Sequence, residues 1–120
     1  MARALAVVRA SGVRSWGLDL IAGLPLLSRA TWADTLRAAV AAAPHHVSVY
    51  DLQVEAGTAF GRWYTPGAHP LPSEGDGADM LRHAHAVLTD AGCAPPARHR
   101  GRHAPRSRGA AQVRALRGEA

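Results

Sequence analysis

The feature that most constrains the fold is a strand, helix and strand pattern compressed into about 40 residues. The first strand, Trp16–Leu24, is a near-continuous apolar run that contains one acid, Asp19. Such a run is typical of a parallel strand that is buried on both faces, and Gly23 and Pro25 end it. The second strand, His46–Val54, is rich in β-branched residues. Two strands joined by one helix predict a right-handed βαβ unit.

Two helices are predicted before the second strand. Ala2–Ala10 carries apolar residues along one side and is closed by Gly12, since glycine readily takes the left-handed cap conformation. In the connecting helix, Thr31 followed by Asp34 predicts a capping box, and apolar positions then repeat at helical spacing as far as Pro44.

A loop rich in glycine and proline, residues 55–72, separates the second strand from a third helix. Ser73 and Asp76 predict a cap at the start of that helix, and Gly92 closes it. Half of the aromatic residues of the chain lie in the loop, and they must pack on something or remain as exposed apolar surface: Phe60, Trp63 and Tyr64.

The net charge of +5 is concentrated in the last part of the chain. Residues 98–120 hold seven arginines and one acid, whereas residues 1–97 hold seven arginines and eight acids. The tail has few sizeable apolar side chains, so residues 1–92 are expected to fold and residues 93–120 to be disordered. An alternative function follows from the same arginines, namely binding of nucleic acid or acidic surfaces, although the tail lacks the aromatic residues that usually stack on bases.

The single cysteine, Cys93, excludes an intrachain disulfide and any multi-cysteine metal site built from this chain alone. A reducing compartment fits, which favours the cytoplasm, or the matrix of a mitochondrion or chloroplast in a eukaryote. The longest apolar run, Leu18–Leu27, contains Asp19 and Pro25 and is too short to span a bilayer. The histidines at positions 45, 46, 83 and 85 do not share a helix face or have cysteine partners, so no metal site is expected.

Asp19 is the most informative single residue, because a carboxylate inside a buried strand is costly unless it is paired or hydrogen-bonded. Ligands of α/β sheets and barrels bind beyond the carboxyl ends of the strands. Gly23, Asp51 and Gln53 lie at such ends, which predicts a ligand site there. A salt bridge from Asp19 to an arginine of a neighbouring helix is an equally good interpretation.

Four segments in a fixed order carry a resemblance to a known family: Trp16–Pro25, Pro44–Tyr50, Val54–Phe60 and Leu71–Met80. Over residues 2–92 the chain resembles the oxygen-independent coproporphyrinogen III oxidase family of radical S-adenosylmethionine (SAM) proteins. The likeness is greater to the HemW-type branch of this HemN/HemW-like family, whose members look like haem chaperones. The resemblance implies an α/β fold, namely the distal half of a partial (β/α)6 barrel with three helices and two parallel strands.

The resemblance also implies roles for individual residues. Asp19 and Gln53 match positions that contact SAM, and Gly23 and Pro25 match the turn where the backbone passes close to that cofactor. The loop on the substrate side is matched by Glu55, Gly57, Thr58 and Phe60. Complete members of the family use SAM and a 4Fe-4S cluster, and porphyrin or haem is the substrate or cargo that the resemblance implies.

The departures from the family pattern are equally informative. The family's Cys-x-x-x-Cys-x-x-Cys loop and its glycine-rich SAM strand would both precede Met1, and its His-Asn-x-x-Tyr-Trp segment has no match after Cys93. We therefore expect an incomplete chain with no catalytic residue and no radical chemistry of its own. The loss of pattern after Gly92, without any lysine, favours out-of-frame translation of a GC-rich gene as one hypothesis. The sequence leaves open whether the family role is that of an oxidase or of a haem chaperone.

Overall fold

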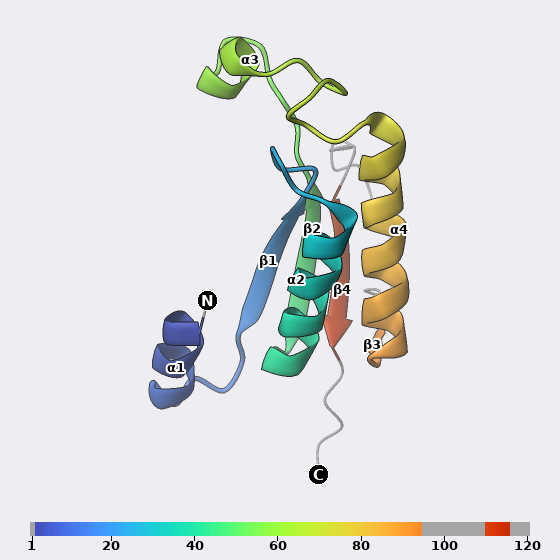
Figure 1. The fold of residues 1–120 in the computed structure, drawn as a ribbon. Coiled ribbons are helices and arrows are strands. Elements are labelled where there is room, and N and C mark those ends of the chain that lie inside the picture. Colours follow the sequence, from blue (N-terminus) through green and yellow to red (C-terminus); the bar gives the residue numbers. More distant parts are fainter. Residues whose placement is uncertain (1, 95–109, 116–120) are drawn as a thin grey trace, which may run out of the picture.

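A four-stranded sheet forms the centre of the computed structural model, which describes residues 2–94 and 110–115 (Figure 1). In order across the sheet, the strands are β1 (Gly17–Ala22), β2 (His46–Asp51), β4 (Ala110–Ala115) and β3 (Cys93–Ala94). The four helices of the described residues are α1 (Ala2–Ala10), α2 (Arg29–Ala42), α3 (Ala59–Trp63) and α4 (Glu74–Asp90). Helices α2 and α4 lie along the sheet, whereas α1 and α3 lie near its opposite ends (Figure 1).

The predicted βαβ unit is confirmed, because β1 and β2 are parallel neighbours joined by α2. Both strands are shorter than predicted. Strand β1 stops at Ala22 because Gly23 takes a left-handed conformation, with φ 78°, and the chain turns there. The ladder continues for one further bond beyond the strands, in which the Leu52 N–H donates to the carbonyl of Ala22 over 2.9 Å.

The prediction of disorder from residue 93 onward is wrong for the part of that segment that the structure describes. Cys93–Ala94 form β3, and Ala110–Ala115 form β4, which pairs antiparallel with both β2 and β3. A free strand edge can be satisfied by any extended backbone, so a weak apolar pattern does not prevent pairing. The prediction for residues 95–109 and 116–120 lies outside the described residues.

The hydrophobic core lies between the sheet and the two long helices. Its buried members come from β1, β2, β3, α2 and α4, and they are Leu20, Ala22, Trp32, Leu36, Ala39, Val47, Val49, Met80, Ala84, Leu88 and Cys93. The Trp32 indole N–H donates to the backbone carbonyl of Met80 over 2.8 Å. This bond joins the two helices while satisfying the polar atom of a buried indole.

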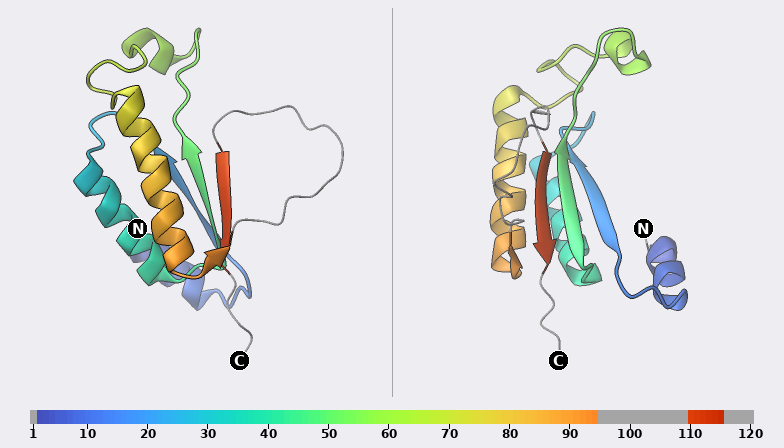
Figure 2. Two further views of the ribbon diagram at one scale, coloured as in Figure 1. Left: turned by 90° about the vertical axis from the view of Figure 1, so that its right-hand side faces the viewer. Right: turned by 180° about the vertical axis from the view of Figure 1, so that it is seen from behind.

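Strand β1 is covered on one face only, so the prediction of a strand buried on both faces is wrong. Leu20 and Ala22 are buried, whereas Asp19 is exposed and Ile21 is 43% exposed. Both long helices lie on the Leu20 side, and no described helix lies over the other side, which faces the viewer in the right-hand view of Figure 2. We call this uncovered side the open face of the sheet.

The helix caps agree with the sequence patterns at one helix and differ at the other. As predicted, Ser73 caps α4, where its hydroxyl accepts the Asp76 N–H over 3.1 Å. Helix α2 begins earlier than predicted, because the Ser28 hydroxyl accepts the Thr31 N–H over 3.1 Å. The predicted Thr31 capping box is therefore wrong, and Asp34 instead forms an ion pair on the helix surface.

None of the helices within the described ranges has the length and apolar character that crossing a membrane requires.

Candidate functional site

A cavity of about 340 Å³ opens at the carboxyl ends of the two parallel strands. The strand ends contribute Gly23, Asp51 and Gln53, and the start of α4 contributes Glu74 and Gly77. The structure thus brings together Gln53, a predicted SAM contact, and Gly23, from the turn predicted to lie close to that cofactor, although they are far apart in sequence. This edge is where ligands of α/β folds usually bind.

Gly23 makes a close approach that larger residues would obstruct. A Cβ atom at this position would lie 3.2 Å from Oδ1 of Asp51, and the φ of 78° is unfavourable for residues with a side chain. The predicted need for glycine at this turn therefore has a geometric basis. At this turn, the Asp51 carboxylate lies beside the backbone at the end of β1.

The polar groups of the cavity are mainly acceptors. The side-chain amide of Gln53 donates to Oδ2 of Asp51 over 3.2 Å, and Glu74 provides a second carboxylate. Carboxylates bind ammonium groups and hydroxyl groups well, because they accept several hydrogen bonds. The cavity therefore suits a ligand that carries positive charge together with hydroxyl donors.

Asp19 lies outside the cavity. It is exposed on the open face of β1, opposite Ser48 in the strand register, and it forms no ion pair with the described residues. The expectation that Asp19 is buried is therefore wrong, because its side of the sheet has no covering layer among the described elements. The salt bridge considered from the sequence is likewise not formed with any described arginine.

Pro25 also lies outside the cavity, in a turn that shapes the loop after β1. The Leu27 N–H donates to the Leu24 carbonyl over 3.1 Å across this turn, and Leu26 has a φ of 62°. Proline is favoured at the position before such a residue, because it fixes φ. The Leu26 N–H donates to the Pro70 carbonyl over 2.8 Å, so the turn anchors the loop that precedes α4.

The four predicted substrate-side residues do not line the cavity but build the base of α3. The Thr58 hydroxyl donates to the Glu55 carbonyl over 2.7 Å and accepts the Gly61 N–H over 3.0 Å, so it caps the helix. Gly57 has a φ of 84°, and Phe60 lies within the helix. Here the predicted loop contains a short helix that its glycine-rich sequence concealed.

The start of α4 was recognised from the sequence as a helix cap but not as a wall of the cavity. A Cβ atom at Gly77 would lie 4.0 Å from Oδ1 of Asp51, which shows how close this helix comes to the end of β2. Two glycines in the first turns of a helix are unfavourable for helix formation, and this cost was a signal that the helix start has another role.

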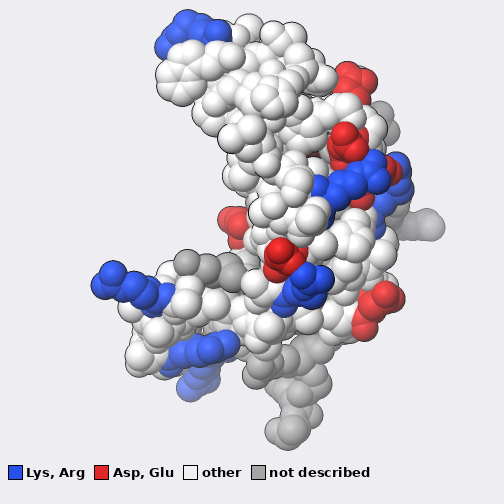
Figure 3. Space-filling view, viewed as in Figure 1, with Lys and Arg blue, Asp and Glu red and all other residues white. Residues whose placement is uncertain are grey.

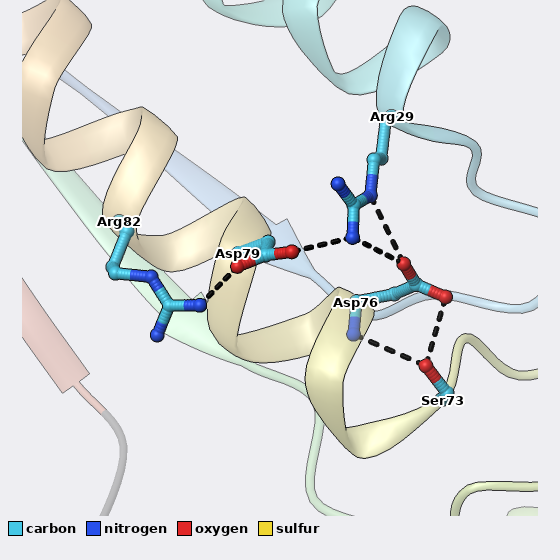
Figure 4. A network of polar contacts seen from close by, with 5 residues as sticks. All are labelled: Arg29, Ser73, Asp76, Asp79 and Arg82. Carbon is cyan, nitrogen blue, oxygen red and sulfur yellow. Dashed lines mark hydrogen bonds and ion pairs between the residues drawn. The ribbon is translucent and has the colours of Figure 1, made fainter.

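An ion-pair network holds the start of α4 against the start of α2 (Figure 4). Nη2 of Arg29 lies 2.7 Å from Oδ1 of Asp76 and also pairs with Asp79, which in turn pairs with Arg82. The hydrogen bond to Asp76 and the charge of Asp79 raise the pKa of Arg29. The hydrogen bond from Ser73, followed by the one from Arg29, lowers the pKa of Asp76.

The described residues do not fit an iron-sulfur cluster. Within residues 2–94 and 110–115, no three histidine, cysteine or acidic residues are grouped so that they could hold a metal ion. Cys93 is buried in the core, and burial raises the pKa of its thiol, which disfavours the thiolate that a cluster requires.

Fold and site together define an α/β protein of the class that binds ligands at the carboxyl ends of parallel strands. No protein-family model matches the chain. Among curated proteins, the heme chaperone HemW of Synechocystis sp. is 41% identical over 90 residues, which is 75% of this chain and 22% of that protein. HemW of Escherichia coli is 36% identical over 92 residues, which is 75% of this chain and 23% of that protein.

The solved structures contain a match of the same kind. Coproporphyrinogen III oxidase (HemN) from Escherichia coli, a radical SAM enzyme, superposes with a TM-score of 0.64 at 30% identity, covering 74% of this chain and 20% of that one. The chain belongs to the HemN/HemW-like family of radical SAM proteins, and it spans about a fifth of the length of the relatives that it matches. The resemblance stated from sequence motifs is thereby confirmed.

Proposed function

We propose that this chain contributes part of a SAM site to a HemN/HemW-like protein of porphyrin or haem metabolism. The observation that carries the proposal is the cavity in which Gly23 and Gln53 meet at the carboxyl edge of β1 and β2. The two kinds of relative have different roles, since HemW is a heme chaperone and HemN a coproporphyrinogen III oxidase. Both roles involve a tetrapyrrole, and we extend this ligand class to the protein of which this chain forms part.

The chemistry of the cavity fits SAM. This cofactor carries a sulfonium cation, an ammonium group and ribose hydroxyls, and the carboxylates of Asp51 and Glu74 can accept hydrogen bonds from the latter two. The volume of about 340 Å³ falls within the usual range for small-molecule sites, roughly 300–1,000 Å³. Asp19, on the open face behind the strand end, is a second candidate contact for a ligand that extends over that face.

The role proposed for this chain is binding and orientation. In a complete family member, a 4Fe-4S cluster supplies the electron that starts radical chemistry with SAM. The described residues do not fit that cluster, so we assign no catalytic residue. A location in the cytoplasm or an organelle matrix is part of the proposal, and one relative, from Bos taurus, is named as mitochondrial.

Isothermal titration of the full chain with SAM tests the proposal. Gln53→Leu removes the amide and is expected to weaken binding about tenfold, which is the value of one charge-assisted hydrogen bond. Gly23→Ala is expected to weaken it by at least as much, because the new methyl group lies against Asp51. Thr89→Ala is the control, since Thr89 is exposed near the far end of α4.

Circular dichroism of each variant verifies that the sheet and helices are retained. Equal SAM affinity in wild type and Gln53→Leu would place the ligand elsewhere, and an absence of measurable binding in the wild type would contradict the proposal altogether.

A further inference from the structure

One wall of the cavity at the strand ends is held in place without core packing. The loop before α4 and the start of that helix form this wall, which we call the α4 wall: Leu71, Pro72, Ser73, Glu74 and Gly77. No residue between Leu71 and Met80 is buried, and the buried residues of α4 begin only at Met80. The start of α4 therefore depends on polar contacts for its position.

Arg29, the first residue of α2, makes such contacts. Its Nε and Nη2 atoms donate to Oδ1 of Asp76 over 3.0 and 2.7 Å, and Nη2 also pairs with Asp79 (Figure 4). In the space-filling view, basic and acidic side chains lie against one another over α2 and α4 (Figure 3). A single guanidinium thus joins α2 to two positions at the start of α4.

Asp76 passes this contact on to the cavity. Its second carboxylate oxygen, Oδ2, accepts the Ser73 hydroxyl over 2.8 Å, and the same hydroxyl accepts the Asp76 N–H over 3.1 Å. Ser73 belongs to the α4 wall, and Glu74 follows it directly. Hydrogen bonds therefore run without a gap from Arg29 to a residue that lines the cavity.

The connection between β1 and α2 holds the same wall at a second point. The Leu26 N–H donates to the Pro70 carbonyl over 2.8 Å, with Leu26 at a φ of 62° and 77% exposed. A left-handed backbone is strained for leucine, and an exposed side chain gains no packing from it. The connection starts at Gly23, which lines the cavity, and leads to Arg29, so one short segment contacts both sides of the site.

We propose that Arg29 is a positioning residue of the cavity, which fixes the α4 wall relative to the Asp51 carboxylate and thereby sets the ligand affinity. This inference rests on the proposed function, which supplies SAM as the ligand. The spacing to be kept is short, because a Cβ atom at Gly77 would lie 4.0 Å from Oδ1 of Asp51. A displacement of about 1 Å is enough to weaken the hydrogen bonds of a bound ligand.

A second arginine of α2 separates positioning from a general effect of surface ion pairs. Arg37 pairs with Asp34 of the same helix, and its side chain is 74% exposed, compared with 64% for Arg29. Exposed ion pairs contribute little to the free energy of unfolding. The two arginines thus differ mainly in what their ion pairs join, so Arg37 provides the matched control.

Isothermal titration of the full chain with SAM tests the positioning role. Arg29→Gln is expected to weaken binding about threefold. Arg29→Glu is expected to weaken it about tenfold, because a third carboxylate then repels Asp76 and Asp79. Arg29→Lys keeps the charge without the planar fork and is expected to rescue much of the affinity lost in Arg29→Gln. Arg37→Gln is expected to leave both SAM affinity and the urea midpoint close to those of the wild type.

Hydrogen exchange of the ligand-free chain gives a readout that does not depend on SAM. The Gly77 and Ala78 amides are expected to exchange faster in Arg29→Gln and at the wild-type rate in Arg37→Gln. Unchanged exchange in Arg29→Gln, or equal SAM affinity in wild type and Arg29→Glu, would overturn the positioning role while leaving the SAM site intact. A wild-type chain that binds no SAM would contradict the proposed function, and the exchange rates would still decide whether Arg29 fixes the α4 wall.

Discussion

The two sides of strand β1 are made from alternate residues, and they differ sharply in exposure to solvent. On the helix side, Leu20 and Val49 pack into a core closed by Trp32 and Leu36, all of them buried. On the open face, Asp19 and Ile21 reach solvent, and α3 extends beyond the strand ends without a buried residue. The helix side holds the fold together, whereas the polar groups of the cavity lie at the strand ends and the start of α4.

This difference shows how an apolar sequence can mislead. The run Trp16–Leu24 has the composition of a strand that is buried on both faces, but composition does not reveal which layers are present to cover it. On β1, which is an edge strand of the sheet, Ile21 is 43% exposed for lack of such a layer among the described elements.

The largest expected effect comes from adjacent residues on β1. Leu20→Ala is expected to lower the free energy of unfolding by about 2–5 kcal/mol, because it leaves a cavity in the core. Ile21→Ala removes as many carbon atoms on the open face and is expected to cost about 1 kcal/mol, since its side chain is already partly hydrated. Urea denaturation followed by circular dichroism measures both values.

The Ile21 variant is the matched control for the Leu20 variant. Equal losses for the two substitutions would mean that the open face is covered in solution, which would abolish the contrast between the two sides.

The next largest effect is expected in the α3 turn, whose local stability should change without a change in the global stability of the core. Gly61→Ala is expected to destabilise the α3 turn by about 1–3 kcal/mol, because the new methyl group overlaps the Glu55 carbonyl. Since α3 contributes nothing to the core, the global urea midpoint is expected to stay nearly the same, and the loss should appear as faster hydrogen exchange of the α3 amides.

Gly75→Ala is the control for a glycine in a regular helix. It lies in α4, where a Cβ atom would have no close contact, and alanine is expected to raise the free energy of unfolding by about 0.5–1 kcal/mol. A large fall in the global midpoint of Gly61→Ala would show that the α3 turn is part of the cooperative core.

Most of the fold was predictable, because its signals are local. The spacing of Trp32 and Leu36, the cap at Ser73 and the βαβ order all follow from neighbouring residues, and all three are confirmed. Strand β4 was not predictable, because its pairing depends on a free backbone edge far away in sequence.

The candidate site was predictable only in part, for a similar reason. Gly23 and Gln53 belong to recognisable strand ends, so their approach followed from the parallel topology. The contribution of Glu74 and Gly77 depends on where α4 starts relative to Asp51, and no sequence pattern encodes that tertiary distance. Asp19 was misplaced because its burial depended on a layer that the described residues do not provide.

A smaller effect is expected at the cap of α4, on the helix side. Ser73→Ala removes the hydroxyl that accepts the Asp76 N–H, and it is expected to lower the free energy of unfolding by about 1 kcal/mol. Ser73→Asp retains a capping acceptor and should restore stability, although its charge would lie near that of Asp76. Urea midpoints of the two variants test whether the cap, rather than mere side-chain volume, is responsible.

The smallest expected effect is a dependence of stability on pH that arises from Asp76. The hydrogen bond from Ser73, and after it the one from Arg29, lowers the pKa of this carboxyl in the folded chain. The stabilisation is therefore fully present above the pKa of the unfolded chain, about 3.9 for aspartate, and is lost as the pH falls through the lower folded value.

Asp76→Asn is expected to flatten the fall of the urea midpoint below about pH 4, and Ser73→Ala should flatten it in part. If Asp76→Asn kept the full acid dependence of the wild type, the network in Figure 4 would not be the source of that dependence.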